Sequence, residues 1–233
     1  MLGIYNEKVQ DLLIPINKRP TEGLKIGESK TLGVFVADLT KYPVSSYAEI
    51  NDKMEEWYQN RTIGSTLMNN TSSRAHTIVT IEFIQVQTVG KTKSEKKSRI
   101  NLVDLAGSER ANFTGANGAR LKEGCNINKS LLVLGNVINT LEDKALGKKK
   151  DVLPPYRDSA LTHILKNDLG GNSKTVMIWA LSPANINYEE TFKCSLRYAG
   201  RAKKIQNKAV IDESEHDKTV TLLKEENDDL KIR

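Results

Sequence analysis

The sequence predicts an α/β protein, and the segment Asn101–Arg110 supports this most directly. It opens with an apolar run that ends at Asp104, as in a buried strand carrying a carboxylate at its C-terminal end. Gly107 and Ser108 follow in a turn where backbone amides can approach a ligand. In phosphate-handling α/β proteins such an aspartate holds Mg²⁺ and such a glycine meets the terminal phosphate, although an ordinary strand ending in a turn has the same pattern.

Composition limits the alternatives. The 233 residues suffice for one substantial core, with 38% hydrophobic and 27% charged residues. No apolar run approaches the roughly 18 residues of a membrane helix, so direct membrane insertion is not expected. Cys125 and Cys194 lie far apart without metal-ligand spacing and are expected to be reduced thiols. The net charge of +6 favours a polyanionic partner, but no nucleic-acid-binding module is recognisable.

A second motif, Asn69–His76, decides the family resemblance. It matches N-x-x-S-S-R-S-H with Ala75 in place of the last serine, and Asp104–Glu109 matches D-L-A-G-S-E without change. Together the two segments resemble the paired nucleotide switches of the kinesin motor domain, and the resemblance runs from Ile4 to about Asp212. It implies a kinesin-type P-loop NTPase motor fold, α/β, with a mostly mixed central sheet flanked by helices.

The first third of the chain predicts two strands and a helix. Ile4–Leu13 predicts a strand leading into a turn, and residues 34–40 a short strand. Between them, residues 14–33 are a Pro/Gly/Lys-rich surface connector. Its glycines do not meet the phosphate-loop template G-x-x-x-x-G-K-[ST]. A helix is predicted from Ser45, a good N-cap, with core positions at helical spacing: Tyr47, Ile50, Met54 and Trp57.

The middle of the chain predicts a β-hairpin and a long helix. Thr77–Val89 alternates as a strand, a basic hairpin tip follows between Lys91 and Arg99, and a second strand returns to Asp104. Residues 111–125 are expected to be a flexible loop. A helix then runs from Asn126 to Glu142 with these apolar positions: Leu131, Leu134, Val137, Ile138 and Leu141. Taken alone this helix packs on a core; by resemblance it is the relay helix that lies against tubulin.

The last third predicts a buried strand at Thr175–Leu181 and a helix from Tyr188 to Ile205. By resemblance, residues 1–206 are a partial motor domain, 207–215 the neck linker and 216–233 the start of a neck helix. Four residues in that helix have coiled-coil spacing over fewer than two heptads, which allows a homodimer: Val220, Leu223, Asn227 and Leu230.

In the family a phosphate loop precedes the segment that matches Ile4. The fold is therefore expected to be incomplete at its N-terminal side, with the apolar faces of 99–104 and 175–181 lacking a neighbour. This chain alone is accordingly expected to be inactive as an ATPase.

The resemblance implies a nucleotide site for ATP and Mg²⁺. Asp104 would hold the metal through water, with Ser73 as a second metal ligand, and Gly107 would sense the γ-phosphate. The implied catalytic set is Ser72, Ser73, Arg74, Asp104, Gly107 and Glu109, and the cofactor-binding set is Asn69, Ser72, Ser73, Asp104 and Gly107. Within it, Arg74 and Glu109 form a latch between the two switches, and His76 has only a supporting role.

The partner implied is the microtubule. Lysines before Tyr156-Arg157-Asp158-Ser159 resemble the lysine-rich loop of the third, axonal-transport-type kinesin subfamily, and would attract acidic tubulin tails. The implied microtubule-binding residues are Arg120, Lys122, Asn128, Lys148, Lys149, Lys150, Arg157 and His163. Two functions remain open: part of a microtubule-stimulated ATPase motor in the cytoplasm, on the microtubule cytoskeleton, or a non-catalytic microtubule-binding module.

Overall fold

The computed structural model describes residues 1–29, 33–67, 74–89, 92–107, 119–148, 152–185, 188 and 195–210. The chain divides into two compact units. The larger comprises Met1–Val79 and Val103–Ala209, and the smaller comprises Thr80–Leu102 and Val210–Arg233.

The chain starts with a tight β-hairpin. β1 (Leu2–Tyr5) pairs antiparallel with β2 (Lys8–Asp11). Asn6 and Glu7 form the turn with φ angles of 53° and 62°, the left-handed backbone that two-residue hairpin turns require. The prediction of one strand from Ile4 towards Leu13 is therefore wrong, because this turn divides it into two.

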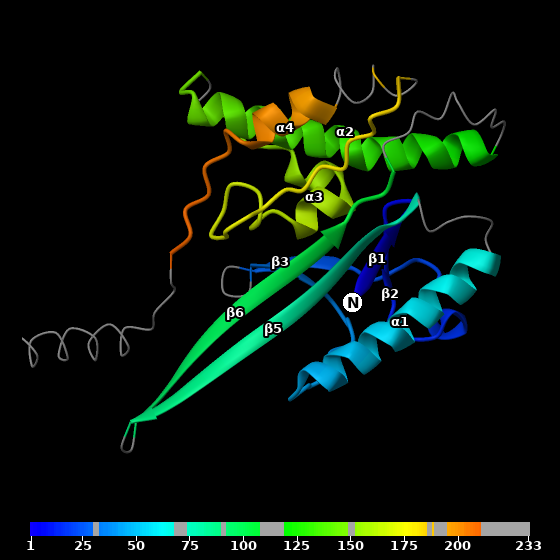
Figure 1. Cartoon of the computed structure of the whole chain (residues 1–233), viewed down its shortest axis with the longest axis vertical. Coiled ribbons are helices and arrows are strands. Elements are labelled where there is room, and N and C mark those ends of the chain that lie inside the picture. Colours follow the sequence, from blue (N-terminus) through cyan, green and yellow to red (C-terminus); the bar gives the residue numbers. More distant parts are fainter. Residues whose placement is uncertain are drawn as a thin grey trace, which may run out of the picture. The chain divides into compact units, whose positions relative to one another are not determined.

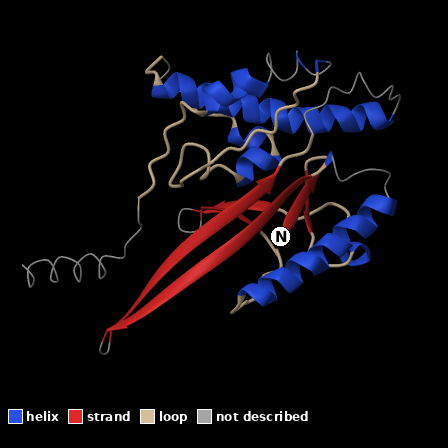
Figure 2. Cartoon of the chain, viewed as in Figure 1, coloured by secondary structure: helices blue, strands red, loops and turns tan. Residues whose placement is uncertain are grey.

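β1 also pairs antiparallel with β5 (His76–Val89), in a register that places Ile4 opposite His76. β6 (Thr92–Asp104) completes the sheet order β2-β1-β5-β6, and Figure 2 shows β5 and β6 as the two arms of a long hairpin. The predicted strand over 77–89 and the strand end at Asp104 are confirmed. The basic residues expected at the hairpin tip instead lie mostly within β6, because the strand already begins at Thr92.

A second, two-stranded sheet begins within the segment expected to be a connector. β3 (Ile26–Ser29) pairs antiparallel with β4 (Gly33–Val36), and a short helical turn, η1 (Ile16–Lys18), precedes them. The prediction of a surface loop over 14–33 is thus wrong for 26–29. The strand predicted at 34–40 is confirmed only for its first residues.

Helices cover both faces of β1. Leu2 and Ile4 are buried in a core shared with α2 and α3 (Figure 1). The opposite face of β1 is at Gly3, because successive strand residues alternate, and a Cβ added to Gly3 would lie 3.2 Å from the side chain of Leu12. There Leu12 and Leu13 pack with Trp57 of α1 (Tyr47–Leu67) in a smaller cluster.

α1 begins at Tyr47, and its cap is Ser46, one residue after the predicted cap Ser45. Ser46 accepts a hydrogen bond from the backbone N–H of Glu49, while the backbone N–H and hydroxyl of Ser45 donate to the Glu49 carboxylate. This reciprocal arrangement satisfies the free donors at a helix start. Trp57 is buried as predicted, but Tyr47 is 81% exposed, so the predicted core stripe starts further along the helix.

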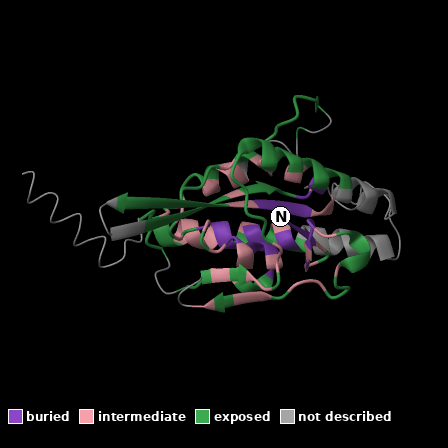
Figure 3. Ribbon diagram, turned by 90° about the horizontal axis from the view of Figure 1, so that it is seen from below, coloured by how far each residue is buried: buried purple, intermediate pink, exposed green. Residues whose placement is uncertain are grey.

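α2 (Ala119–Ala145) is the long helix of the core. It begins at Ala119 rather than Asn126, so the loop expected over 111–125 is helical in its last part. Its buried residues follow helical spacing: Val133, Leu134, Val137 and Ile138. Figure 3 colours the ribbon by burial. α3 (Ala160–Ile164) and α4 (Arg197–Ala202) both contact α2. No helix within these described ranges has the length and apolar character to cross a bilayer.

The segment 175–181 is not the buried strand predicted. It has no regular secondary structure, and Val176 and Ile178 are 86% and 91% exposed, whereas Met177 packs against the core. Exposed extended chain can satisfy its backbone groups with water. No strand among the described residues pairs with it.

Candidate functional site

The turn after β6 contains two of the residues expected to handle phosphate. Asp104 ends β6 and is exposed, and Gly107 follows in irregular chain. Between them Ala106 is buried, with 5% of its surface exposed. Its backbone N–H donates to Nδ1 of His76 at 2.9 Å. One hydrogen bond therefore fixes this turn to the first residue of β5.

His76 also contacts the long helix. Its Nε2 lies 2.6 Å from Oγ of Ser130 on α2, and both residues are 2% exposed. A backbone N–H can only donate, so the bond from Ala106 requires an unprotonated Nδ1. The neutral ring then carries its proton on Nε2 and donates to the Ser130 hydroxyl. The imidazole thus joins the sheet, the Asp104–Gly107 turn and α2.

The surroundings of His76 keep its ring neutral. Burial lowers the pKa of His76 to about 4, because a charged imidazolium loses its hydration there, and the nearby Asp104 carboxylate offsets only part of this effect. At pH 7 the side chain is a neutral hydrogen-bonding group. The His76 side chain therefore connects segments of the fold, and it does not act as a proton donor at this pH.

The structure tests only part of the predicted nucleotide site. Arg74 lies in a short helical turn two residues before β5, so it is close in sequence to the His76 junction. The other residues of the first switch, and the glutamate of the expected latch, lie outside the described residues: Asn69, Ser72, Ser73 and Glu109. The Arg74–Glu109 pair therefore stays a prediction.

Asp104 suits a magnesium ion by its chemical type. Mg²⁺ takes hard oxygen ligands and commonly binds one or two carboxylates, with water completing its shell. An exposed carboxylate at a strand end can provide such a ligand. Across the part of the chain that the structure describes, no group of three His, Cys, Asp or Glu side chains could enclose a metal ion. Asp104 is a single carboxylate and Ser73 lies outside the described residues, so the magnesium site stays a prediction.

The sequence profile of the kinesin motor domain matches residues 1–205. The chain belongs to the kinesin motor domain family. Solved structures confirm the predicted fold. A KIF14 dimer bound to a microtubule matches with a TM-score of 0.80 and 44% identity, covering 91% of this chain and 59% of that one. A fast kinesin matches with a TM-score of 0.78 and 42% identity, covering 92% of this chain and 57% of that one.

Curated kinesins are similar over almost the whole chain. Kinesin-related protein 1 of Dictyostelium discoideum is 53% identical over 228 residues, and human kinesin-like protein KIF1B is 52% identical over 233 residues. Each alignment covers 97% of this chain, but only 10% and 13% of the respective relative. The kinesin domain described here thus spans a small part of the length of these relatives. The predicted axonal-transport-type subfamily fits the KIF1-type matches.

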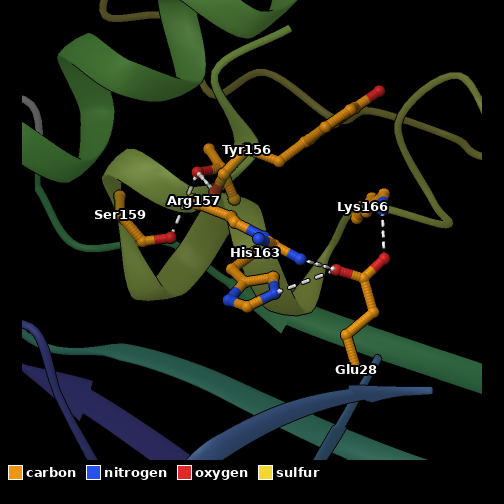
Figure 4. A network of polar contacts seen from close by, with 7 residues as sticks. Glu28, Tyr156, Arg157, Ser159, His163 and Lys166 are labelled. Carbon is orange, nitrogen blue, oxygen red and sulfur yellow. Dashed lines mark hydrogen bonds and ion pairs between the residues drawn. The ribbon is translucent and has the colours of Figure 1, made fainter. Parts of the chain in front are cut away.

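A second polar site of this kinesin domain surrounds Glu28 on β3 (Figure 4). Its Oε2 accepts a hydrogen bond from Nη2 of Arg157 at 2.8 Å and lies 3.7 Å from Nε2 of His163. Lys166 pairs with the other carboxylate oxygen. Hydrogen bonds from Arg157 and Lys166 lower the pKa of Glu28 to about 2. One carboxylate thus collects basic side chains from η4 (Tyr156–Asp158), from α3 and from the turn after α3.

Glu7 holds the start of α3 against the first hairpin. Its carboxylate accepts from the hydroxyl of Ser159 at 3.2 Å and from the backbone N–H of Ala160 at 2.8 Å. Ser159 in turn caps α3 by accepting from the backbone N–H of Leu161. The left-handed turn that contains Glu7 therefore positions the segment that carries the expected microtubule-binding residues.

The expected microtubule-binding residues differ in exposure. The Arg157 side chain is 75% exposed although it is paired, and the His163 side chain only 16%. Lys148 lies in the turn after α2 and is exposed. Lys149 and Lys150 lie outside the described residues. Of Arg120, Lys122 and Asn128, the structure describes the helical backbone but not the side chains.

The sequence analysis missed Ser130, Glu28 and Lys166. Ser130 is a single serine within the helix predicted from Asn126 to Glu142. Glu28 lies in a segment interpreted as a connector. Their partners are 54 residues or more away along the chain, and no local pattern indicates such pairs. The one available signal was His76 itself, the last residue of the first switch motif.

Proposed function

We propose that this chain supplies the nucleotide-switch and microtubule-binding segments of an ATP-driven motor that moves along microtubules. The observation that carries the proposal is the junction at His76, where the start of β5, the Asp104–Gly107 turn and α2 meet through two hydrogen bonds. A motor needs such a junction, because the segment that senses nucleotide must be in contact with the segment that binds the track. Membership of the kinesin family supports the same reading.

In this proposal the chain contributes the switch residues to a motor site that binds ATP with Mg²⁺. Asp104 and Ser73 hold the ion, Ser72 and Asn69 orient the attacking water and the phosphate, and Gly107 offers its backbone N–H to the γ-phosphate. When bound, Mg²⁺ neutralises charge on the phosphate oxygens during transfer. Catalysis then depends on positioning and electrostatics, since phosphoryl transfer requires little covalent chemistry from the protein.

The track-binding surface combines α2 with basic residues that follow it. The three expected lysines, 148–150, succeed the helix, and Arg157 is exposed further along the chain. A cluster of basic residues attracts the acidic surface of a microtubule electrostatically, and salt weakens this attraction. The similar KIF14 structure is described as a complex with a microtubule. Binding of this kind would place the protein on cytoplasmic microtubules.

The remaining segments have roles in the same proposal. Residues 1–206 form the motor portion, 207–215 the neck linker, and 216–233 the start of a neck helix that can pair two copies. Asn207 contacts the core: its side-chain oxygen accepts from the backbone N–H of Gly170, and its amide donates to the carbonyl of Asp168. These contacts support the placement of the linker start beside the turn after α3.

Co-sedimentation with microtubules tests the proposal. The protein is spun with taxol-stabilised microtubules in a salt series, in the presence of ADP, of AMP-PNP or of no nucleotide. A motor is expected to bind several-fold more tightly with AMP-PNP than with ADP, and to weaken as salt rises. Binding that is equal in all three nucleotide conditions would favour the non-catalytic module, and absence of binding would contradict both functions.

A further inference from the structure

We propose that His76 is a positioning residue through which the Asp104–Gly107 turn and α2 move together, so that microtubule contact with α2 sets the position of the turn. This inference rests on the proposed motor function. It adds a route between the nucleotide-binding turn and the microtubule-binding helix α2. The route consists of two hydrogen bonds, from Ala106 N–H to Nδ1 and from Nε2–H to Ser130 Oγ.

The two bonds are buried, which makes them costly to break. His76 and Ser130 are each 2% exposed and Ala106 is 5% exposed. Water cannot easily replace a partner at such sites, and a buried polar group without a partner is unfavourable. A displacement of the turn or of α2 must therefore carry the imidazole with it or leave two polar groups unpaired.

The backbone that carries the His76 ring is held in the sheet. The backbone of His76 pairs with Ile4 of β1, a strand that is buried on its helix-facing side. The side chain can swing on this anchor, but its backbone cannot follow a moving loop. Since a donor–acceptor distance of about 3.6 Å is no longer a hydrogen bond, a shift of the turn relative to α2 by roughly 1 Å along either bond would break that bond.

The helix side of the route is rigid as well. Ser130 lies one turn before Val133 and Leu134, and the next turn adds Val137. These three side chains are buried in the main core. A displacement of α2 therefore moves Ser130 with the rest of the helix. The opposite end of the route lies two residues from Asp104, the expected metal ligand.

A purely structural role would give the same contacts, so the variants must separate coupling from stability. Ser130→Ala removes the hydroxyl and leaves the bond between Ala106 and the ring. His76→Asn keeps an acceptor where Nδ1 lies but cannot reach Ser130. Ser130→Thr restores the hydroxyl. Ile138→Val removes one buried methylene from α2 without touching the route, and controls for lost stability.

The test is steady-state ATPase activity of the full-length protein, with and without microtubules. Coupling between sites commonly amounts to a factor of roughly 5 to 150. Ser130→Ala is expected to keep its basal rate within about two-fold and to lose roughly ten-fold of the microtubule-stimulated kcat, with a smaller change in the KM for microtubules. Ser130→Thr should recover most of that loss and Ile138→Val should cause none. The double variant His76→Asn/Ser130→Ala should lose no more than the worse single variant, because both changes break one route.

Three outcomes would overturn the inference. Ser130→Ala could behave like Ile138→Val, the effects of His76→Asn and Ser130→Ala could add, or Ser130→Ala could raise the KM with kcat unchanged. In each case the wild-type protein would still be a motor. If the wild-type protein itself shows no stimulation by microtubules, the proposed function fails, and this inference fails with it. The wild-type measurement therefore distinguishes the two failures.

Discussion

Arg157 donates a hydrogen bond to Glu28 at 2.8 Å, across 129 residues of sequence. The arginine is among the residues expected to contact tubulin, and its side chain is 75% exposed. Its charge is therefore partly neutralised before any partner arrives. Lys166 shares the same carboxylate, so Glu28 opposes the electrostatic attraction of two cations to an acidic surface.

Replacing Glu28 by Gln should strengthen microtubule binding. The change leaves Arg157 and Lys166 available to tubulin carboxylates, and exposed ion pairs of this kind are weak enough to be exchanged. We expect the Kd from co-sedimentation to fall roughly two- to five-fold at low salt, and the gain to shrink as salt rises. Glu22→Gln, at the exposed pair with Lys8, is the control. An unchanged or higher Kd for Glu28→Gln would contradict this account of the cluster.

The Glu28 pairs should also weaken in acid. The folded-state pKa of about 2 lies below the ordinary value of 4.5, so the pairs contribute stability above pH 4.5 and lose it as the pH falls towards 2. The carboxyl ¹³C shift of Glu28, followed by NMR, should titrate near pH 2. Arg157→Ala should raise the midpoint towards the ordinary value, and Lys174→Ala, with the same loss of charge, should not. A wild-type midpoint at the ordinary value would show that the pairs do not form in solution.

Neutralising Lys148, Lys149 and Lys150 should weaken microtubule binding mainly at low ionic strength. A lysine cluster attracts acidic tails through an electrostatic field that salt screens, and it fixes no register. The Kd should rise several-fold in low salt and converge with the wild-type value at high salt. Neutralising Lys96, Lys97 and Arg99 on β6 makes the same change in net charge and serves as the control. A loss that is equal at all salt concentrations would refute the electrostatic role.

The buried face of α2 should dominate the stability of the fold. Ile138 is fully buried, whereas Leu132 on the same helix is 65% exposed. Ile138→Ala should lower the free energy of unfolding in urea by about 2–5 kcal/mol, from lost burial and the remaining cavity. Leu132→Ala should change it by less than about 0.5 kcal/mol. Similar losses for the two variants would mean that α2 does not pack as described.

Some features of this molecule follow from local sequence, and others do not. The strand that ends at Asp104 and the apolar seam of α2 were predicted, because each depends on periodicity within one segment. The turn at Asn6 and Glu7 was missed because it lacks the usual glycine. The junction of His76 with Ser130 depends on partners 54 residues apart, which no local pattern encodes. Segment 175–181 was mistaken for a buried strand, since apolar residues predict burial but not the presence of a neighbour.

Glu109→Ala tests the predicted latch with Arg74. The latch is expected to close the two switches around bound nucleotide, so its loss should leave ATP binding within about three-fold and suppress turnover by about a hundred-fold or more. Binding is followed with a fluorescent ATP analogue and turnover by phosphate release. Glu95→Ala, on β6, is the control. Unchanged turnover in Glu109→Ala would remove the latch from the account.

The central claim is that the turn at Asp104 is part of the nucleotide site of a microtubule-stimulated ATPase. The most direct measurement is the ATPase rate of the full-length protein at saturating microtubules, wild type against Asp104→Asn. The account predicts stimulation in the wild type and a loss of about a hundred-fold or more in Asp104→Asn, with microtubule binding retained. A stimulated rate that does not change in Asp104→Asn would contradict it.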